Sequence, residues 1–159
     1  MKPIMKAVVC VGVLTMASLM LSQSARAQGC SLQGVAGNYG FTLTGLLILP
    51  TGAVPIAAVG AATVDPKGNV TGTEARTVGG NYADETLQGT LTVNGQCTGS
   101  MTLNFYESGQ LVRTSVLSIV FDDSQREIRM VQKSLQLPNG VVLPVVITVE
   151  GKKISTEDD

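Results

Sequence analysis

The chemistry open to this chain is limited first by the residue types that it lacks. The 159-residue sequence contains no histidine, the side chain most often used as a general base and as a metal ligand near neutral pH. Ser–His–Asp and Cys–His catalytic arrangements are therefore excluded within this chain. Its three cysteines are also too few for a four-cysteine zinc site. We favour a protein that is not an enzyme, and we expect no catalytic residue, no metal site and no cofactor.

Two pairs of adjacent carboxylates remain as candidates for acid–base or cation chemistry. These pairs are Asp84-Glu85 and Asp122-Asp123. The second stands in a stretch of turn-forming residues, and we interpret both as solvated turn residues. Neither pair has the ordered ligand spacing of a dedicated calcium loop.

Arg113 is a charged residue within a predicted strand, 111–121, that is otherwise mostly apolar. One interpretation, which we favour, places Arg113 on the outer face of the sheet in contact with water. The other turns it inward, where its guanidinium would bind a carboxylate. The sequence leaves both interpretations open.

Small side chains dominate from Ala57 to Ala62, in the middle of another predicted strand. They suit a tightly curved inner surface, or they leave room for a ligand. Aromatic side chains such as Tyr39 and Tyr106 would line the entrance of such a site or pack with their hydroxyls at its edge. The residues that we expect to line a ligand site are Tyr39, Phe41, Ala58, Ala62, Phe105 and Arg113.

β-Strands must position these residues, and the clearest pair of strands lies between Leu87 and Phe105. Apolar residues alternate with hydroxyl and amide residues on both sides of Asn94-Gly95. A period of two places the apolar set on one face, and Asn-Gly is a strong signal for a hairpin turn. We therefore predict an antiparallel hairpin here.

Similar strands, joined by short turns, follow one another along the rest of the chain. They are predicted at 38–49, 54–64, 70–77, 111–121, 127–137 and 141–150, with a longer loop at 79–85. Pro144 suggests the edge of a sheet or the seam of a barrel. The pattern predicts an all-β protein, a single antiparallel eight-stranded meander closed into a barrel. A two-sheet β-sandwich is the alternative.

The N-terminal segment has the features of a secretory signal peptide. Lys2 and Lys6 precede an apolar stretch, and Ala25-Arg26-Ala27 forms a cleavage site. We predict three parts: a signal peptide at 1–27, the barrel domain at 28–155 and a disordered acidic tail at 156–159. Cys30 and Cys97 remain after cleavage, and we expect them to form a disulfide because export favours oxidation.

Export to the periplasm or the extracellular space is the predicted localisation. Without the leader the formal net charge falls from −1 to −4, and no basic patch points to nucleic acid as a partner. We expect no stable membrane insertion after cleavage, because the apolar stretch of the leader is short for a membrane-spanning helix and is removed with the leader. The oligomeric state stays open.

Three motifs, Gly37-Asn-Tyr-Gly-Phe41, Leu91-Thr-Val-Asn94 and Cys97-Thr-Gly99, make the chain resemble a group of exported bacterial proteins with no established function. The resemblance extends over most of the chain after Cys30. That group in turn resembles the allene oxide cyclase and dirigent type of eight-stranded barrel, which is calycin-like. The resemblance implies the fold only. No catalytic motif of those plant enzymes matches, so no catalytic residue carries over.

Three functions agree with these observations. The favoured one is a secreted, non-catalytic barrel that binds a small apolar ligand or a surface component, since an eight-stranded barrel is either just filled or holds one small ligand. The second is a cyclase- or isomerase-like enzyme that steers a lipid or phenolic intermediate by shape. The third is a purely structural exported protein.

Overall fold

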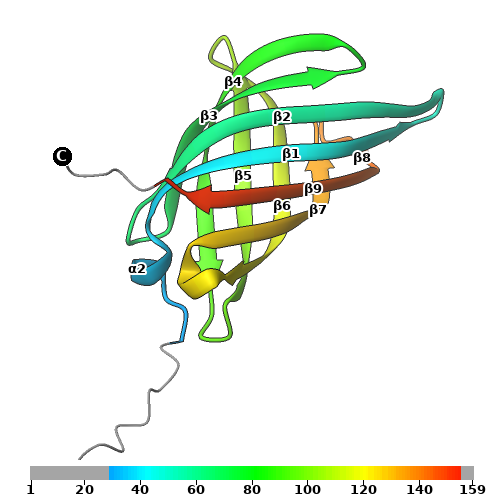
Figure 1. Ribbon diagram of the computed structural model, residues 1–159. Helices are drawn as coiled ribbons and strands as arrows, with labels where there is room; N and C mark the ends of the chain where they lie inside the picture. Colours follow the sequence, from blue (N-terminus) through cyan, green and yellow to red (C-terminus); the bar gives the residue numbers. More distant parts are fainter. Residues whose placement is uncertain (1–28, 155–159) are drawn as a thin grey trace, which may run out of the picture.

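A computed structural model describes residues 29–154, and its strands enclose one apolar core (Figure 1). The predicted leader at 1–27 and the predicted tail at 156–159 lie outside the described residues. No helix in the described part of the chain is long and apolar enough to cross a bilayer. The elements are α2 (Leu32–Val35), β1 (Gly37–Leu49), β2 (Gly52–Val64), β3 (Asn69–Val78), β4 (Asn81–Val93), β5 (Thr98–Glu107), β6 (Gln110–Asp122), the 3-10 helix η2 (Asp123–Gln125), β7 (Glu127–Gln136), β8 (Val142–Leu143) and β9 (Val145–Lys153).

Eight antiparallel strands close into a barrel. β1 to β7 pair in chain order, and β9 closes the barrel because it pairs with both β1 and β7. The two-residue strand β8 is an addition that pairs with the end of β7. The predicted barrel is confirmed, and the sandwich alternative is wrong.

The predicted hairpin between Leu87 and Phe105 is present, with residues 94–97 connecting its two strands. Leu87 is opposite Phe105, and Leu91 is opposite Met101. All four side chains are buried in the barrel, whereas Gln88 and the threonines between them face outward. The alternation of the sequence is therefore the alternation between the inside and the outside of the barrel.

The segment 79–85 is not the long loop that we predicted. Only Gly79 and Gly80 form the turn, both with positive φ, and β4 begins directly after them at Asn81. This register continues the alternation of Leu87 back to Glu85, which is buried instead of solvated. The interpretation of Asp84-Glu85 as a solvated turn is therefore wrong.

Pro144 lies at the seam of the barrel, as its position suggested. Proline has no N–H for a strand ladder, and it separates β8 from β9. The carbonyl of Pro144 still accepts a hydrogen bond from the backbone N–H of Ile48 at 2.8 Å. β7 pairs with β9 from Glu127 to Val131 and then continues to pair with β8 at Leu135 and Gln136.

The N-terminal segment closes one end of the barrel. α2 is capped by Ser31, whose hydroxyl accepts a hydrogen bond from the N–H of Gly34 at 3.1 Å. Val35, in the same helix, is fully buried. The disulfide between Cys30 and Cys97 ties this segment to the β4–β5 turn, with 4.8 Å between the two Cα atoms. The predicted disulfide is confirmed, and we call this end of the barrel the closed end.

Tyr39 fastens α2 to the barrel from inside. Its ring is buried, and its hydroxyl donates a hydrogen bond to the carbonyl of Val35 at 2.6 Å. Burial raises the pKa of this phenol, because the charged form would lose its hydration. The hydroxyl therefore stays a neutral donor.

Replacing Tyr39 by phenylalanine is expected to lower the free energy of unfolding by about 1–2 kcal/mol, because the buried carbonyl of Val35 loses its partner. Urea denaturation checks this value. Tyr82→Phe is the control, since Tyr82 is 67% exposed and bonds only Asp84 on the surface. An equal loss in both variants would contradict the fastening role of Tyr39.

Candidate functional site

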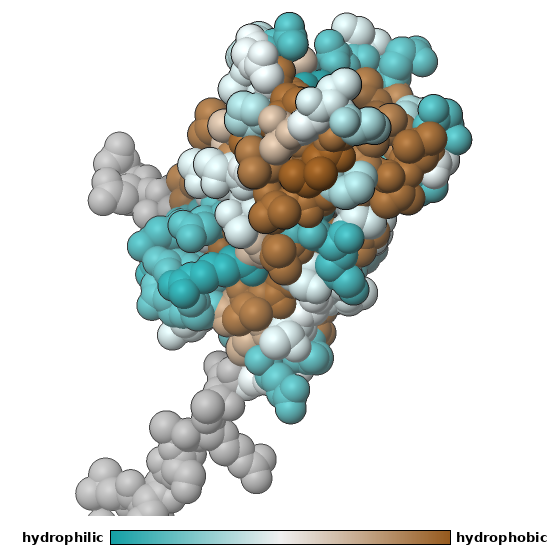
Figure 2. All heavy atoms as spheres, turned by 90° about the vertical axis from the view of Figure 1, so that its right-hand side faces the viewer, coloured by the Kyte–Doolittle hydropathy of each residue, from teal (hydrophilic) through white to brown (hydrophobic). Residues whose placement is uncertain are grey.

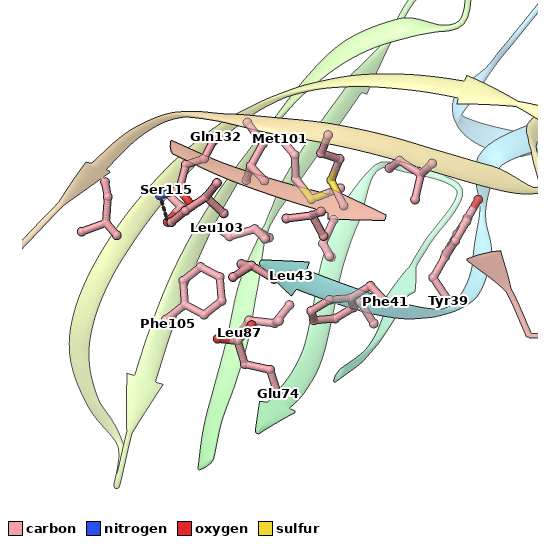
Figure 3. A pocket seen from close by; sticks show the side chains of 18 of the residues that line it. Tyr39, Phe41, Leu43, Glu74, Leu87, Met101, Leu103, Phe105, Ser115 and Gln132 are labelled. Carbon is pink, nitrogen blue, oxygen red and sulfur yellow. Dashed lines mark hydrogen bonds between the residues drawn. The ribbon is translucent and has the colours of Figure 1, made fainter. Parts of the chain in front are cut away.

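The interior of the barrel is nearly filled by its own side chains. The interior cavity that remains has a volume of about 50 Å³, which is comparable to the space taken by one or two water molecules. Side chains from strands all around the barrel converge on it, as Figure 3 shows for Leu43, Glu74, Met101 and Gln132. The cavity has room for a water molecule or two, and not for a lipid.

The small residues of β2 do not leave the empty space that one interpretation of the sequence allowed. Ala58, Gly60 and Ala62 point inward, and Ala57 points outward. The ring of Phe41 covers the wall at Gly60, where an added Cβ would lie 2.5 Å from its Cζ atom. The small residues therefore fit a curved wall against which an aromatic ring packs.

A network of charged side chains crosses the interior toward the other end of the barrel. Glu74 on β3 and Glu85 on β4 are directly opposite each other, and both point inward and are buried. Two carboxylates in this arrangement repel each other. Arg113 on β6 lies between them: it donates to Glu74 Oε1 at 2.6 Å from Nη2 and to Glu85 from Nη1.

Two further residues extend this network to the surface. Arg76 donates from Nε to Glu85 Oε1 at 2.5 Å, and its Nη2 lies 3.6 Å from Glu107 Oε2. The Arg113 guanidinium also stacks on Phe105, with 3.7 Å from its Cζ to the ring centre. The network thus holds three carboxylates against two guanidiniums.

Glu74 is the less well hydrogen-bonded of the two buried carboxylates in this network. Its Oε2 atom is buried and has no hydrogen-bond partner. Burial raises the pKa of this carboxyl above its ordinary value, although the charge and the hydrogen bond of Arg113 act in the opposite direction. We infer that Glu74 takes up a proton more readily than the same side chain does in the unfolded chain.

A second hollow opens to the surface at the end of the barrel opposite α2. This mouth pocket has a volume of about 150 Å³, and its walls are Leu47, Ile56, Val78, Val112, Leu135, Leu137 and Leu143. Arg76 and Arg113 form its polar floor. Ile56, Arg113 and Leu135 also line the interior cavity, so these three side chains separate the two spaces.

Most of the residues predicted to line a ligand site do line the interior cavity. Tyr39, Phe41, Ala62, Phe105 and Arg113 surround it, whereas Ala58 points inward beside it without lining it. Of these residues only Arg113 also reaches the mouth pocket. Their role toward a ligand stays a prediction.

Arg113 points inward, so our favoured outward placement is wrong. The alternation of β6 is ambiguous, because Val112, Val116 and Val120 on the other face are as apolar as the inner set. The carboxylates that Arg113 binds belong to the protein itself.

The sequence-based predictions did not include the charged network of Glu74, Arg76 and Glu85. A signal for them does exist: Val70, Gly72, Glu74, Arg76 and Val78 are spaced by two, which places both charged residues on the face of Val70. Taken with Glu85 in phase with Leu87, this spacing indicates buried charges of both signs. No group of three or more metal-ligating side chains is assembled among residues 29–154.

No protein-family model and no curated protein sequence matches this chain. Among solved structures, it is similar to EF1p2_mFAP2b bound to DFHBI, with a TM-score of 0.55 and 12% sequence identity over 79% of this chain and 100% of that one. It is also similar to a redesigned β-barrel, mFAP1, bound to DFHBI, with a TM-score of 0.51 and 15% identity over 77% of this chain and 98% of that one. At such identities these similarities establish the barrel fold alone.

Proposed function

We propose that the protein binds a small, largely apolar molecule in the mouth pocket, with one neutral oxygen of that molecule on Arg76. The main support for this proposal is the composition of the pocket, in which seven aliphatic side chains surround two guanidiniums. Apolar walls with a few polar groups are typical of small-molecule sites. The two similar barrels are named for complexes with a small ligand, DFHBI, which supports binding by a barrel of this shape.

Arg76 is the anchor in this proposal because it has donors to spare. Its Nε is bonded to Glu85, but its nearest other carboxylate contact, at 3.6 Å to Glu107, is longer than a hydrogen bond. A ligand carbonyl or hydroxyl oxygen can accept from these remaining N–H groups. A ligand carboxylate fits less well, because it would add a fourth negative charge to a network with two positive ones.

The test is calorimetric titration with 1-octanol of the chain from Gln28 to Asp159, which contains every described strand. Arg76→Lys, which keeps the charge with fewer donors, is expected to weaken octanol binding on the order of tenfold. Leu143→Trp is expected to fill the pocket and to abolish octanol binding. Val120→Trp, on the outer wall near the closed end, leaves binding unchanged.

Octanoate is the matched ligand, and we expect it to bind less tightly than octanol. Equal affinity of the wild type and of Leu143→Trp for octanol would contradict the proposed site. Stronger binding of octanoate than of octanol would contradict the neutral headgroup. The cyclase- or isomerase-like alternative is not favoured, because the cavity beside Glu74 is too small for such an intermediate.

Secretion also belongs to this proposal. The disulfide supports it, because such bonds persist in oxidising compartments. Recovery of the exported chain beginning at Gln28, with Cys30 linked to Cys97, tests the predicted cleavage.

A further inference from the structure

Charged residues are distributed unequally between the two ends of the barrel. The segments at the closed end, 65–69, 94–97, 122–127 and 150–154, contain nine charged side chains. The segments at the mouth, 49–53, 78–82, 107–111 and 137–144, contain one, Glu107, which lies beside Arg76.

Large apolar side chains are exposed around this same end. We call them the mouth rim: Leu46, Ile48, Tyr82, Leu111, Val142 and Val146, which are 38–67% exposed. Leu46 and Val146 are direct neighbours across β1 and β9, so the apolar surface continues from strand to strand. Figure 2 shows this side of the molecule, with apolar residues gathered at its centre and polar residues around them.

We propose that the mouth rim docks on the surface of a lipid bilayer, with the barrel axis upright and the mouth pocket facing the lipid. Exposed apolar patches of this kind mark interaction sites. Aliphatic side chains from the ends of separate strands can enter the interfacial region together, and an exposed tyrosine such as Tyr82 suits the headgroup level. The association is peripheral, which agrees with the expectation of no stable insertion.

A bilayer fits this surface better than a protein partner does. Charged groups around an interface steer a protein partner and fix its register, and few lie beside the mouth rim: Glu107 near Arg76, and Asp84, which accepts a hydrogen bond from the Tyr82 hydroxyl. A hydrocarbon surface needs no such pairing. Because the rim also lacks basic residues and the predicted mature chain has a net charge of −4, binding is not expected to increase with anionic lipid.

The proposal rests on the outer side chains and not on a ligand, so it stands or falls independently of the proposed function. The experiment is flotation of the Gln28–Asp159 chain with phosphatidylcholine vesicles, with and without anionic lipid. The wild type is expected to float with both. Val142→Asp and Val146→Asp are each expected to reduce the bound fraction on the order of tenfold.

Val120→Asp is the matched control, because Val120 is 48% exposed on the outer wall near the closed end. It is expected to float like the wild type. Equal loss in Val120→Asp and Val142→Asp, or no flotation of the wild type, would overturn the proposal. A stable dimer by light scattering that Val142→Asp dissociates would assign the rim to a second copy and would overturn it as well.

Discussion

Arg113→Met is expected to lower the free energy of unfolding by about 3–5 kcal/mol at neutral pH, because it leaves two buried carboxylates without their shared cation. Glu74 and Glu85 are each almost fully buried and directly opposite one another. Methionine approximates the length of the arginine stem and can still pack on Phe105, so most of the loss reports the charge and not the packing. Urea denaturation at pH 7 measures it.

The loss in Arg113→Met should shrink as the pH falls. Arg113 lowers the pKa of Glu74 by its charge and its hydrogen bond, so its removal raises that pKa further above the ordinary value. A carboxyl with a raised pKa in the folded state stabilises that state below its unfolded pKa, and this contribution disappears as pH rises through the folded pKa. The difference between wild type and variant is therefore expected to be smaller at pH 4 than at pH 7.

Two further variants separate this explanation from a general packing defect. Adding Glu74→Gln and Glu85→Gln to Arg113→Met removes the uncompensated charges and should recover much of the lost stability. Arg129→Met is the surface control: Arg129 is largely exposed and lies 3.2 Å from Asp122, and its loss should stay within about 1 kcal/mol. Failure of the triple variant to recover would contradict the charge explanation.

Removal of the disulfide is expected to cause the second large loss in the free energy of unfolding. The double variant Cys30→Ser/Cys97→Ser is expected to lose roughly 4 kcal/mol, because the bond closes a loop with a sequence separation of 67, and an open chain has more conformational freedom when unfolded. Urea denaturation with and without dithiothreitol measures the loss.

The reductant provides an internal control for the disulfide prediction. It should lower the stability of the wild type to that of the double variant and leave the double variant unchanged. Wild-type stability that does not respond to complete reduction would contradict the predicted stabilisation by this bond.

The strands and their closure could be predicted because local pattern and global structure agree. Between Leu87 and Phe105 each apolar residue of the two strands faces the core, and the turn lies at the predicted place, although Cys97 and not Gly95 has the positive φ. Pro144 could likewise be placed at the seam from its missing N–H. These features depend only on the order of neighbouring residues.

The charged network could not be predicted, because its stability depends on residues distant in sequence. Glu74 and Arg113 are 39 positions apart. Only the closed barrel places Arg113 of β6 between the carboxylates of Glu74 on β3 and Glu85 on β4. A buried carboxylate is expensive unless it is paired, so without knowledge of the partner the solvated interpretation of Glu85 was the natural one.

The filled interior is a similar case. Small residues on β2 suggested space, but Phe41 on the neighbouring strand packs against Gly60. Whether a gap in one strand remains open depends on the side chains that other strands direct into it. The structure thus moves the candidate ligand site from the interior to the mouth.

Methyl chemical-shift mapping with 1-octanol tests the central claim, binding in the mouth pocket, most directly. The methyl groups of Leu47, Leu137 and Leu143 line this pocket, whereas Leu91 is buried in a different part of the core and does not line it. We predict saturable shifts at the first three residues, with Leu91 unchanged, and their loss in Leu143→Trp. Saturable shifts confined to Leu91 and other residues away from the mouth, or no saturable shift at all, would contradict the account.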